Sequence, residues 1–265
     1  MSLVTTDTDL ALARSVLYRG LTLGFSLPSE ASLAQLASAE ARAALEQAAA
    51  LLDSCRVAAE PLGPGIRAFG STPAGGLPVL RRSYARLFGH SHGLVPPFET
   101  EYGGEVSFRQ PQELADIAGY YLAFGLKPAA GVDERADHVA CECEFMDFLA
   151  RKEALVAASA RDSAAGAEAG EQREIICEAA RGFLRDHLGH FGRTFAVRVA
   201  KADAGGFFGA LGGVMLRLLG LECERFGVPP GPATLELRPP APEPAPMACG
   251  SCVGGEPLIQ PRPRP

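Results

Sequence analysis

Four short patterns place side chains that bind metals or protons close together. They are His138 with Glu142, Cys141 with Cys143, His187 with His190, and Cys249 with Cys252. Residues four apart share a face of a helix, so His138 and Glu142 could meet one ion, whereas residues two apart point roughly 200° away from each other. No third helical ligand accompanies His138 and Glu142, so a hydrogen-bonded pair is expected there. Cys141 and Cys143 are expected to be small core or surface residues.

Cys249 and Cys252 have the spacing of a zinc knuckle or of a redox dithiol. A closed structural zinc site needs four ligands, and this sequence has one such pair, so a second copy would have to come from a partner chain. Two interpretations therefore stay open: a metal-binding or cofactor-carrying pair, and an inert segment.

Motifs of nucleophilic catalysis and of nucleotide binding are missing from the sequence. There is no G-x-S-x-G elbow, no phosphate loop, and no G-x-G-x-x-G after a strand. We therefore expect a protein that is not an enzyme and that needs no cofactor of its own.

The composition describes an ordinary globular chain. Of its 265 residues 47% are hydrophobic, and 25 basic against 31 acidic residues give a net charge of −6 without a basic cluster, which argues against nucleic-acid binding. Seven scattered cysteines and no secretory pattern indicate the cytoplasm. No apolar run reaches the roughly 18 residues of a membrane span, so stable membrane insertion is not expected.

Helical periodicity runs through most of the chain. Helices are expected over residues 8–25, 29–53 (as one helix or two), 80–88, 111–125, 132–156, 174–188 and 207–226, with connections at 60–78 and 90–104. Since no stretch alternates with period two, the fold class is predicted to be all-α, a single helical bundle of about eight to ten helices.

The domain organisation follows from two changes in composition. Residues 1–227 are expected to form the bundle, with an internal hinge near 159–171, where Ala, Gly and charged residues lack apolar periodicity. This hinge could allow helix exchange between two chains, so monomer and homodimer both stay open. Twelve of the 21 prolines fall in residues 228–265, which predicts an extended, largely disordered tail.

Four segments together resemble a known family. Tyr84-Ala-Arg-Leu87-Phe88 is similar to a Y-x-x-L-F helix end, and Val95-Pro96-Pro97-Phe98-Glu99-Thr100-Glu101-Tyr102 to a V-P-P-Y-E-S-x-Y loop. Asp137-His138 with Glu142-x-Glu144-Phe145-Met146-x-x-Leu149 is similar to D-H-x-x-x-E-L-E-F-M-x-x-L, and Phe183 to Leu188 to F-L-x-x-H-L. The order and spacing resemble the TorD/DmsD/NarJ family of redox-enzyme maturation chaperones over residues 8–227. Cys143, Phe98 and Phe191 depart from the family's usual residues.

The resemblance implies a cytoplasmic all-helical chaperone. It would bind the twin-arginine signal peptide, the apo form, or both, of the catalytic subunit of a molybdopterin-containing oxidoreductase until the cofactor is inserted. The peptide-binding positions expected from the resemblance and from charge complementarity are Leu87, Phe88, Pro97, Phe98, Glu99, Tyr102, Asp137, His138 and Glu142. Asp137 could instead cap a helix, and His138 could be a buried core residue. A nucleotide-dependent maturation factor, or an assembly factor using Cys249 and Cys252, is the alternative.

Overall fold

The protein is described by a computed structural model that covers residues 6–55, 61–69, 75–89, 93–104, 110–127, 134–160 and 166–238. The elements are α1 (Asp7–Phe25), α2 (Glu30–Ala37), α3 (Ala39–Ser54), α4 (Gly63–Phe69), α5 (Gly76–Phe88), the 3₁₀ turn η1 (Glu99–Glu101), α6 (Gln110–Ala123), α7 (Val139–Ser159), α8 (Gly166–Phe183), the π-helical turn η3 (Leu184–Leu188), α9 (Gly189–Ala202) and α10 (Phe207–Phe226). The β-structure among these described residues consists of two isolated bridges. The predicted all-α fold is confirmed.

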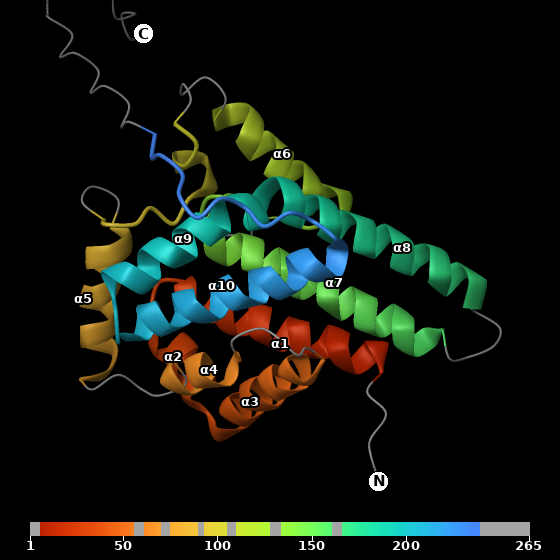
Figure 1. The fold of residues 1–265 in the computed structure, drawn as a ribbon, viewed down its shortest axis with the longest axis horizontal. Coiled ribbons are helices and arrows are strands. Elements are labelled where there is room, and N and C mark those ends of the chain that lie inside the picture. The colour runs from red at the N-terminus through yellow and green to blue at the C-terminus, as the bar shows by residue number, and fades with distance from the viewer. Residues whose placement is uncertain are drawn as a thin grey trace, which may run out of the picture.

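Helices α1 and α7 form the centre of the bundle (Figure 1). Helix α1 packs along α7 and α3, α7 along α8, and α10 along α9 and α4. Their shared core is rich in phenylalanine: the ring of Phe88 lies 6.3 Å from that of Phe25 and 5.3 Å from that of Phe208, and Phe195 lies 5.1 Å from Phe25. Edge-on contacts of this kind add to the burial of the rings and tie α1, α5, α9 and α10 together.

Serine side chains decide where the alanine-rich N-terminal region divides. Ser29 begins α2, and the Ser38 hydroxyl accepts a hydrogen bond of 3.0 Å from Ala41 N–H at the start of α3. A capping serine satisfies a donor that has no partner within the helix. The stretch 29–53 therefore forms two helices, the second of the two arrangements expected.

Four features of the expected helix pattern were wrong. The connection 60–78 contains α4, because Pro64 sits in the first helical turn, where proline needs no N–H partner. The helix expected over 132–156 begins only at Val139, since the residues before it pair with a loop. Helix α8 begins at Gly166, inside the expected hinge, and the helix expected over residues 174–188 gives way to η3 after Phe183.

Residues 228–238, here called the strap, run back along the bundle in an extended conformation (Figure 1). Side chains of α9 hold it, because Arg193 donates to Gly231 O over 2.8 Å and Arg198 donates to Leu235 O over 2.9 Å. The expected extension is present, but the strap is packed on the body, so the expectation of disorder was wrong for these residues. Cys249 and Cys252 lie outside the described residues, and a metal role for them stays a prediction.

The described helices contain none that is long and apolar enough to cross a membrane. Among the same residues, no three metal-binding side chains come together. His138 and Glu142 therefore do not belong to a metal site formed by the described part of the chain.

Candidate functional site

Residues 95–102, here called the Pro-Pro loop, are joined to the start of α7 by backbone hydrogen bonds. Val139 N–H donates to Pro97 O, and Glu99 N–H donates to Asp137 O, each over 2.9 Å. Between these bonds Phe98 and His138 face each other as antiparallel partners. Two segments that lie far apart in the sequence thus form one unit.

Asp137 fastens this unit from inside, with a side chain that is fully buried. Its Oδ2 accepts hydrogen bonds from the Thr100 hydroxyl at 2.8 Å and from Thr100 N–H at 3.2 Å. The Arg135 guanidinium donates to both carboxylate oxygens, at 3.0 and 2.8 Å. The cap of α7 is His138 rather than Asp137, because His138 Nδ1 accepts from Ala140 N–H over 3.1 Å. Asp137 therefore positions the Pro-Pro loop.

Arg135 covers Phe98 from the outside. Its guanidinium carbon lies 4.2 Å from the centre of the Phe98 ring, which leaves Phe98 4% exposed, and the His138 ring lies 5.3 Å away on another side. A guanidinium over an aromatic face is held by the ring quadrupole. Sequence reasoning missed Arg135, although its place two residues before Asp137 is a signal that could have drawn attention to it.

A second buried group lies behind the loop, where α7, η1 and η3 meet. Glu142 is fully buried, and neither of its oxygens accepts a hydrogen bond from a described residue, so the expected side-chain pair with His138 is not formed. Burial and the nearby Glu99 carboxylate raise the pKa of Glu142 well above its ordinary value. A protonated Glu142 can donate to Glu99, which gives both carboxyl groups a partner.

Glu99 also reaches His187, whose Nδ1 lies 3.1 Å from Glu99 Oε1. Burial lowers the pKa of His187, but the hydrogen bond with Glu99 and the charges of Glu99 and Asp116 raise it more, so the net shift is upward. His187 belongs to the F-L-x-x-H-L segment, and only its contact with Glu99 assigns it to this site.

The remaining expected positions lie in the aromatic core. Leu87 is fully buried, and Phe88 stacks on Phe195 with ring centres 5.9 Å apart. Tyr102 donates its hydroxyl hydrogen to Pro96 O over 2.7 Å, which closes the Pro-Pro loop on itself. The nine expected positions thus fall into three groups. The hydrogen-bonded residues around Asp137 are here called the polar lock, Glu142 and Glu99 form an acid pair, and the others form a buried hydrophobic support.

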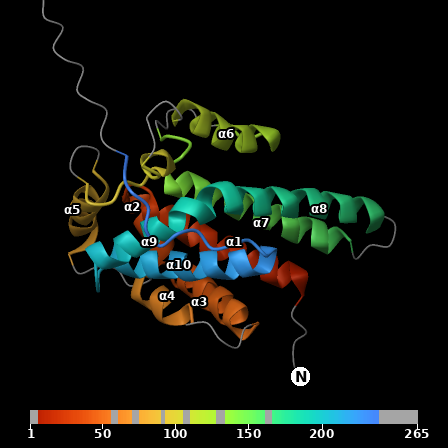
Figure 2. The same cartoon turned by 45° about the horizontal axis from the view of Figure 1, so that its top comes forward.

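Acidic side chains are accessible on the surface above this lock. Glu101, Glu113 and Asp116 have side chains that are 36, 33 and 70% exposed, on η1 and on α6. Helix α6 lies on the same side of the bundle as the Pro-Pro loop (Figure 2). The arrangement can attract a basic segment.

The family model described as nitrate reductase delta subunit matches residues 30–197, which include the Pro-Pro loop, α7 and η3. The chain belongs to this family. Its members are maturation chaperones of molybdoenzymes, so the predicted relation to the TorD/DmsD/NarJ group is confirmed. No curated protein matches the chain.

In this member of the delta subunit family, the environments of Cys141 and Cys143 do not favour a catalytic or metal-binding role for the two thiols. Cys143 is fully buried, and burial raises the pKa of both thiols, that of Cys141 to about 12. A thiol that stays protonated is a poor nucleophile and a poor metal ligand. The two residues are small packing residues, as expected.

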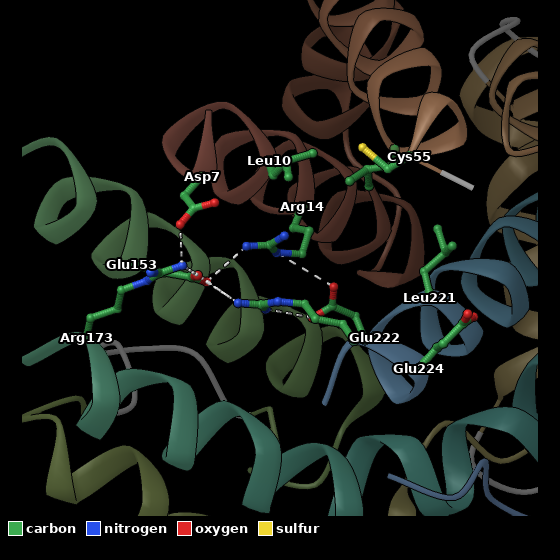
Figure 3. A pocket seen from close by; sticks show the side chains of 11 residues that line it. Asp7, Leu10, Arg14, Cys55, Glu153, Arg173, Leu221, Glu222 and Glu224 are labelled. Carbon is green, nitrogen blue, oxygen red and sulfur yellow. Dashed lines mark hydrogen bonds and ion pairs between the residues drawn. The ribbon is translucent and has the colours of Figure 1, made fainter. Parts of the chain in front are cut away.

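This delta subunit family member also contains a cavity of about 310 Å³ at the other end of α7 (Figure 3). It is lined by Asp7, Leu10, Arg14, Leu52, Cys55, Glu153, Arg173, Leu221, Glu222, Glu224 and Arg225. Buried Arg14 of α1 lies 3.0 Å from a Glu153 oxygen on α7 and 3.7 Å from a Glu222 oxygen on α10. Arg225 donates to both oxygens of Glu153 over 2.7 and 2.8 Å.

The charges around this cavity largely compensate one another. Burial raises the pKa of Glu222, while Arg14 and Arg225 act in the opposite direction. Buried ion pairs that join several helices contribute mainly to the relative placement of those helices. We therefore assign Arg14, Glu153, Glu222 and Arg225 to the support of the bundle.

Proposed function

We propose that this protein is a cytoplasmic chaperone for the catalytic subunit of a molybdopterin-containing oxidoreductase. It would bind the twin-arginine signal peptide or the unloaded subunit, hold it while the cofactor is inserted, and then release it for export. Membership of the nitrate reductase delta subunit family carries this proposal.

The Pro-Pro loop supplies the surface on which we place the peptide. A twin-arginine signal is basic and then apolar. Glu101 of this loop and Asp116 of α6 beside it are acidic and exposed. Asp137, His138, Phe98 and Glu142 are buried, so their contribution would come through the shape of the loop. Leu87 and Phe88 would support the loop from the core.

The proposal is tested with a fluorescent synthetic peptide that carries two adjacent arginines followed by an apolar stretch. The full-length protein is expected to bind it more tightly than a peptide with alanines in place of the two arginines. Glu101→Gln combined with Asp116→Asn should weaken binding about fivefold, since exposed charge pairs contribute about 0.5 kcal/mol each. Equal affinity for the two peptides would refute recognition of the arginines.

A matched control is available on the same molecule. Glu40 and Glu46 are exposed on α3, which lies on the opposite side of the bundle from α6 (Figure 2). Glu40→Gln combined with Glu46→Gln removes the same net charge away from the Pro-Pro loop, so it should leave the affinity nearly unchanged. A loss equal to that of the first variant would mean that net charge, rather than this surface, attracts the peptide.

A further inference from the structure

The strap pairs with the end of the Pro-Pro loop as an added strand. Leu237 and Tyr102 face each other as antiparallel partners. The backbone hydrogen bonds on either side, from Gly103 to Glu236 and from Arg238 to Glu101, are both 2.8 Å long. Proteins use the same pattern to bind an extended peptide at an open backbone edge. The chain thus fills the backbone edge next to Tyr102 with its own residues.

The side chains of the strap present apolar groups followed by a basic one. Leu235 and Leu237 pack against the hydrophobic core, and the Arg238 guanidinium lies 2.7 Å from Glu113 of α6. The Arg238 side chain is only 6% exposed. The backbone of residues 101–103 and the side chain of Glu113 are here called the seat. The seat thus accepts an extended segment in which an apolar residue is adjacent to an arginine.

The hydrogen-bond donors of Arg238 are only partly satisfied in this seat. Its Nε and Nη1 atoms are buried and have no hydrogen-bond partner among the described residues. A guanidinium has five N–H donors, and leaving buried donors without acceptors costs stability. A segment whose own arginine found more acceptors in this position would displace the strap.

The geometry points to one seat that is shared by the strap and the client peptide. The inference rests on the proposed function and adds the place and manner of binding: the client segment pairs with the backbone of residues 101–103 and puts an arginine against Glu113. The occupant is defined by chemistry, an extended segment with adjacent apolar and basic residues. The strap runs from apolar to basic and a twin-arginine signal from basic to apolar, so the client would lie on this edge in the opposite chain direction, parallel to residues 101–103, with its arginine against Glu113 and its apolar residues in the places of Leu235 and Leu237. The strap covers this edge until a client replaces it.

The first test uses the full-length protein with Arg238→Glu, which places two carboxylates opposite each other and should release the strap. The probe is the fluorescent peptide with two arginines and an apolar stretch. If the strap occupies the seat in about nine molecules of ten, release raises the affinity about tenfold. Leu237→Ser, which removes an apolar contact, should act in the same direction.

The matched control is Arg42→Glu. Arg42 is an exposed arginine of α3, on the side of the bundle away from the strap (Figure 1). Its substitution changes the net charge equally and should leave the affinity unchanged. Circular dichroism of each variant reports whether the helices are intact.

The second test asks whether the strap and the client compete. A synthetic copy of residues 229–240 should displace the probe from the Arg238→Glu protein, and a copy with glutamate at position 238 should not. Unchanged affinity of the probe in both strap variants would overturn the shared seat and leave the proposed function standing. A probe that binds neither wild type nor variant, while the strap copy binds the variant, would overturn both.

Discussion

The Thr100 hydroxyl donates to Asp137 Oδ2 over 2.8 Å and joins the Pro-Pro loop to the start of α7. Asp137 also holds Arg135, which covers Phe98, so one carboxylate organises the polar half of the site. Since Asp137 is fully buried, its substitution acts on a peptide only through this organisation.

Asp137→Ala should lower the free energy of unfolding by about 2–3 kcal/mol, because buried Thr100 loses its acceptor and Arg135 loses a charged partner. Arg135 is partly exposed and regains water, which limits the loss. Urea unfolding monitored by circular dichroism measures the change. Glu101→Gln, which removes the exposed partner of Arg135, should cost less than about 0.5 kcal/mol. Equal effects of the two substitutions would contradict the assigned role of Asp137.

Glu142→Gln should change how stability depends on pH. The pKa of Glu142 is raised in the folded state, so its favourable contribution is complete below the unfolded pKa and is lost as the pH rises through the folded pKa. Glutamine does not ionise and can donate to Glu99. The variant should therefore gain stability relative to wild type between pH 5 and pH 8, as measured by urea unfolding at both values.

Exposed Glu144, on the same helix, provides the control for this pH dependence. Glu144→Gln should shift stability by a similar small amount at both pH values. If Glu142→Gln behaves in the same way, Glu142 is not a buried acid whose ionisation is opposed by its surroundings.

Arg14→Met should destabilise the bundle by about 3 kcal/mol, because it leaves Glu153 and Glu222 buried with fewer counter-charges. Urea unfolding gives the value. Arg19→Met, on the same helix, removes an exposed ion pair with Glu144 and should cost under about 1 kcal/mol. Similar costs at the two positions would show that the Arg14 network does not brace the helices.

Gly231→Ala should destabilise the folded strap, because a Cβ at this position would collide with the carbonyl oxygens of Gly189 and His190. A cost of about 1–3 kcal/mol is expected in urea unfolding. Gly213→Ala provides the contrast, since a Cβ there meets open space within α10 and should stabilise the helix by about 0.5–1 kcal/mol. Stabilisation by Gly231→Ala would contradict close docking of the strap.

The all-α class, the helix over residues 8–25 and the core role of Phe145 and Leu149 were predictable from the sequence, because periodicity and helix propensity are local properties. The four family motifs, too, indicated which segments to compare in the structure, and the assignment of these segments to a peptide site stays a prediction. The sequence alone did not show which of the nine expected positions belong to the polar lock, to the acid pair or to the hydrophobic core.

Only the tertiary structure decided which partners each polar group has. The contacts of Asp137 with Thr100, of Glu99 with His187 and of Leu237 with Tyr102 join residues far apart in the chain, and no sequence spacing encodes them. Proline content predicted an extended segment after Val228, which is a local backbone property. Whether that segment packs depends on donors from α9 and on an open edge beside Tyr102, and the folding of the whole chain brings those together.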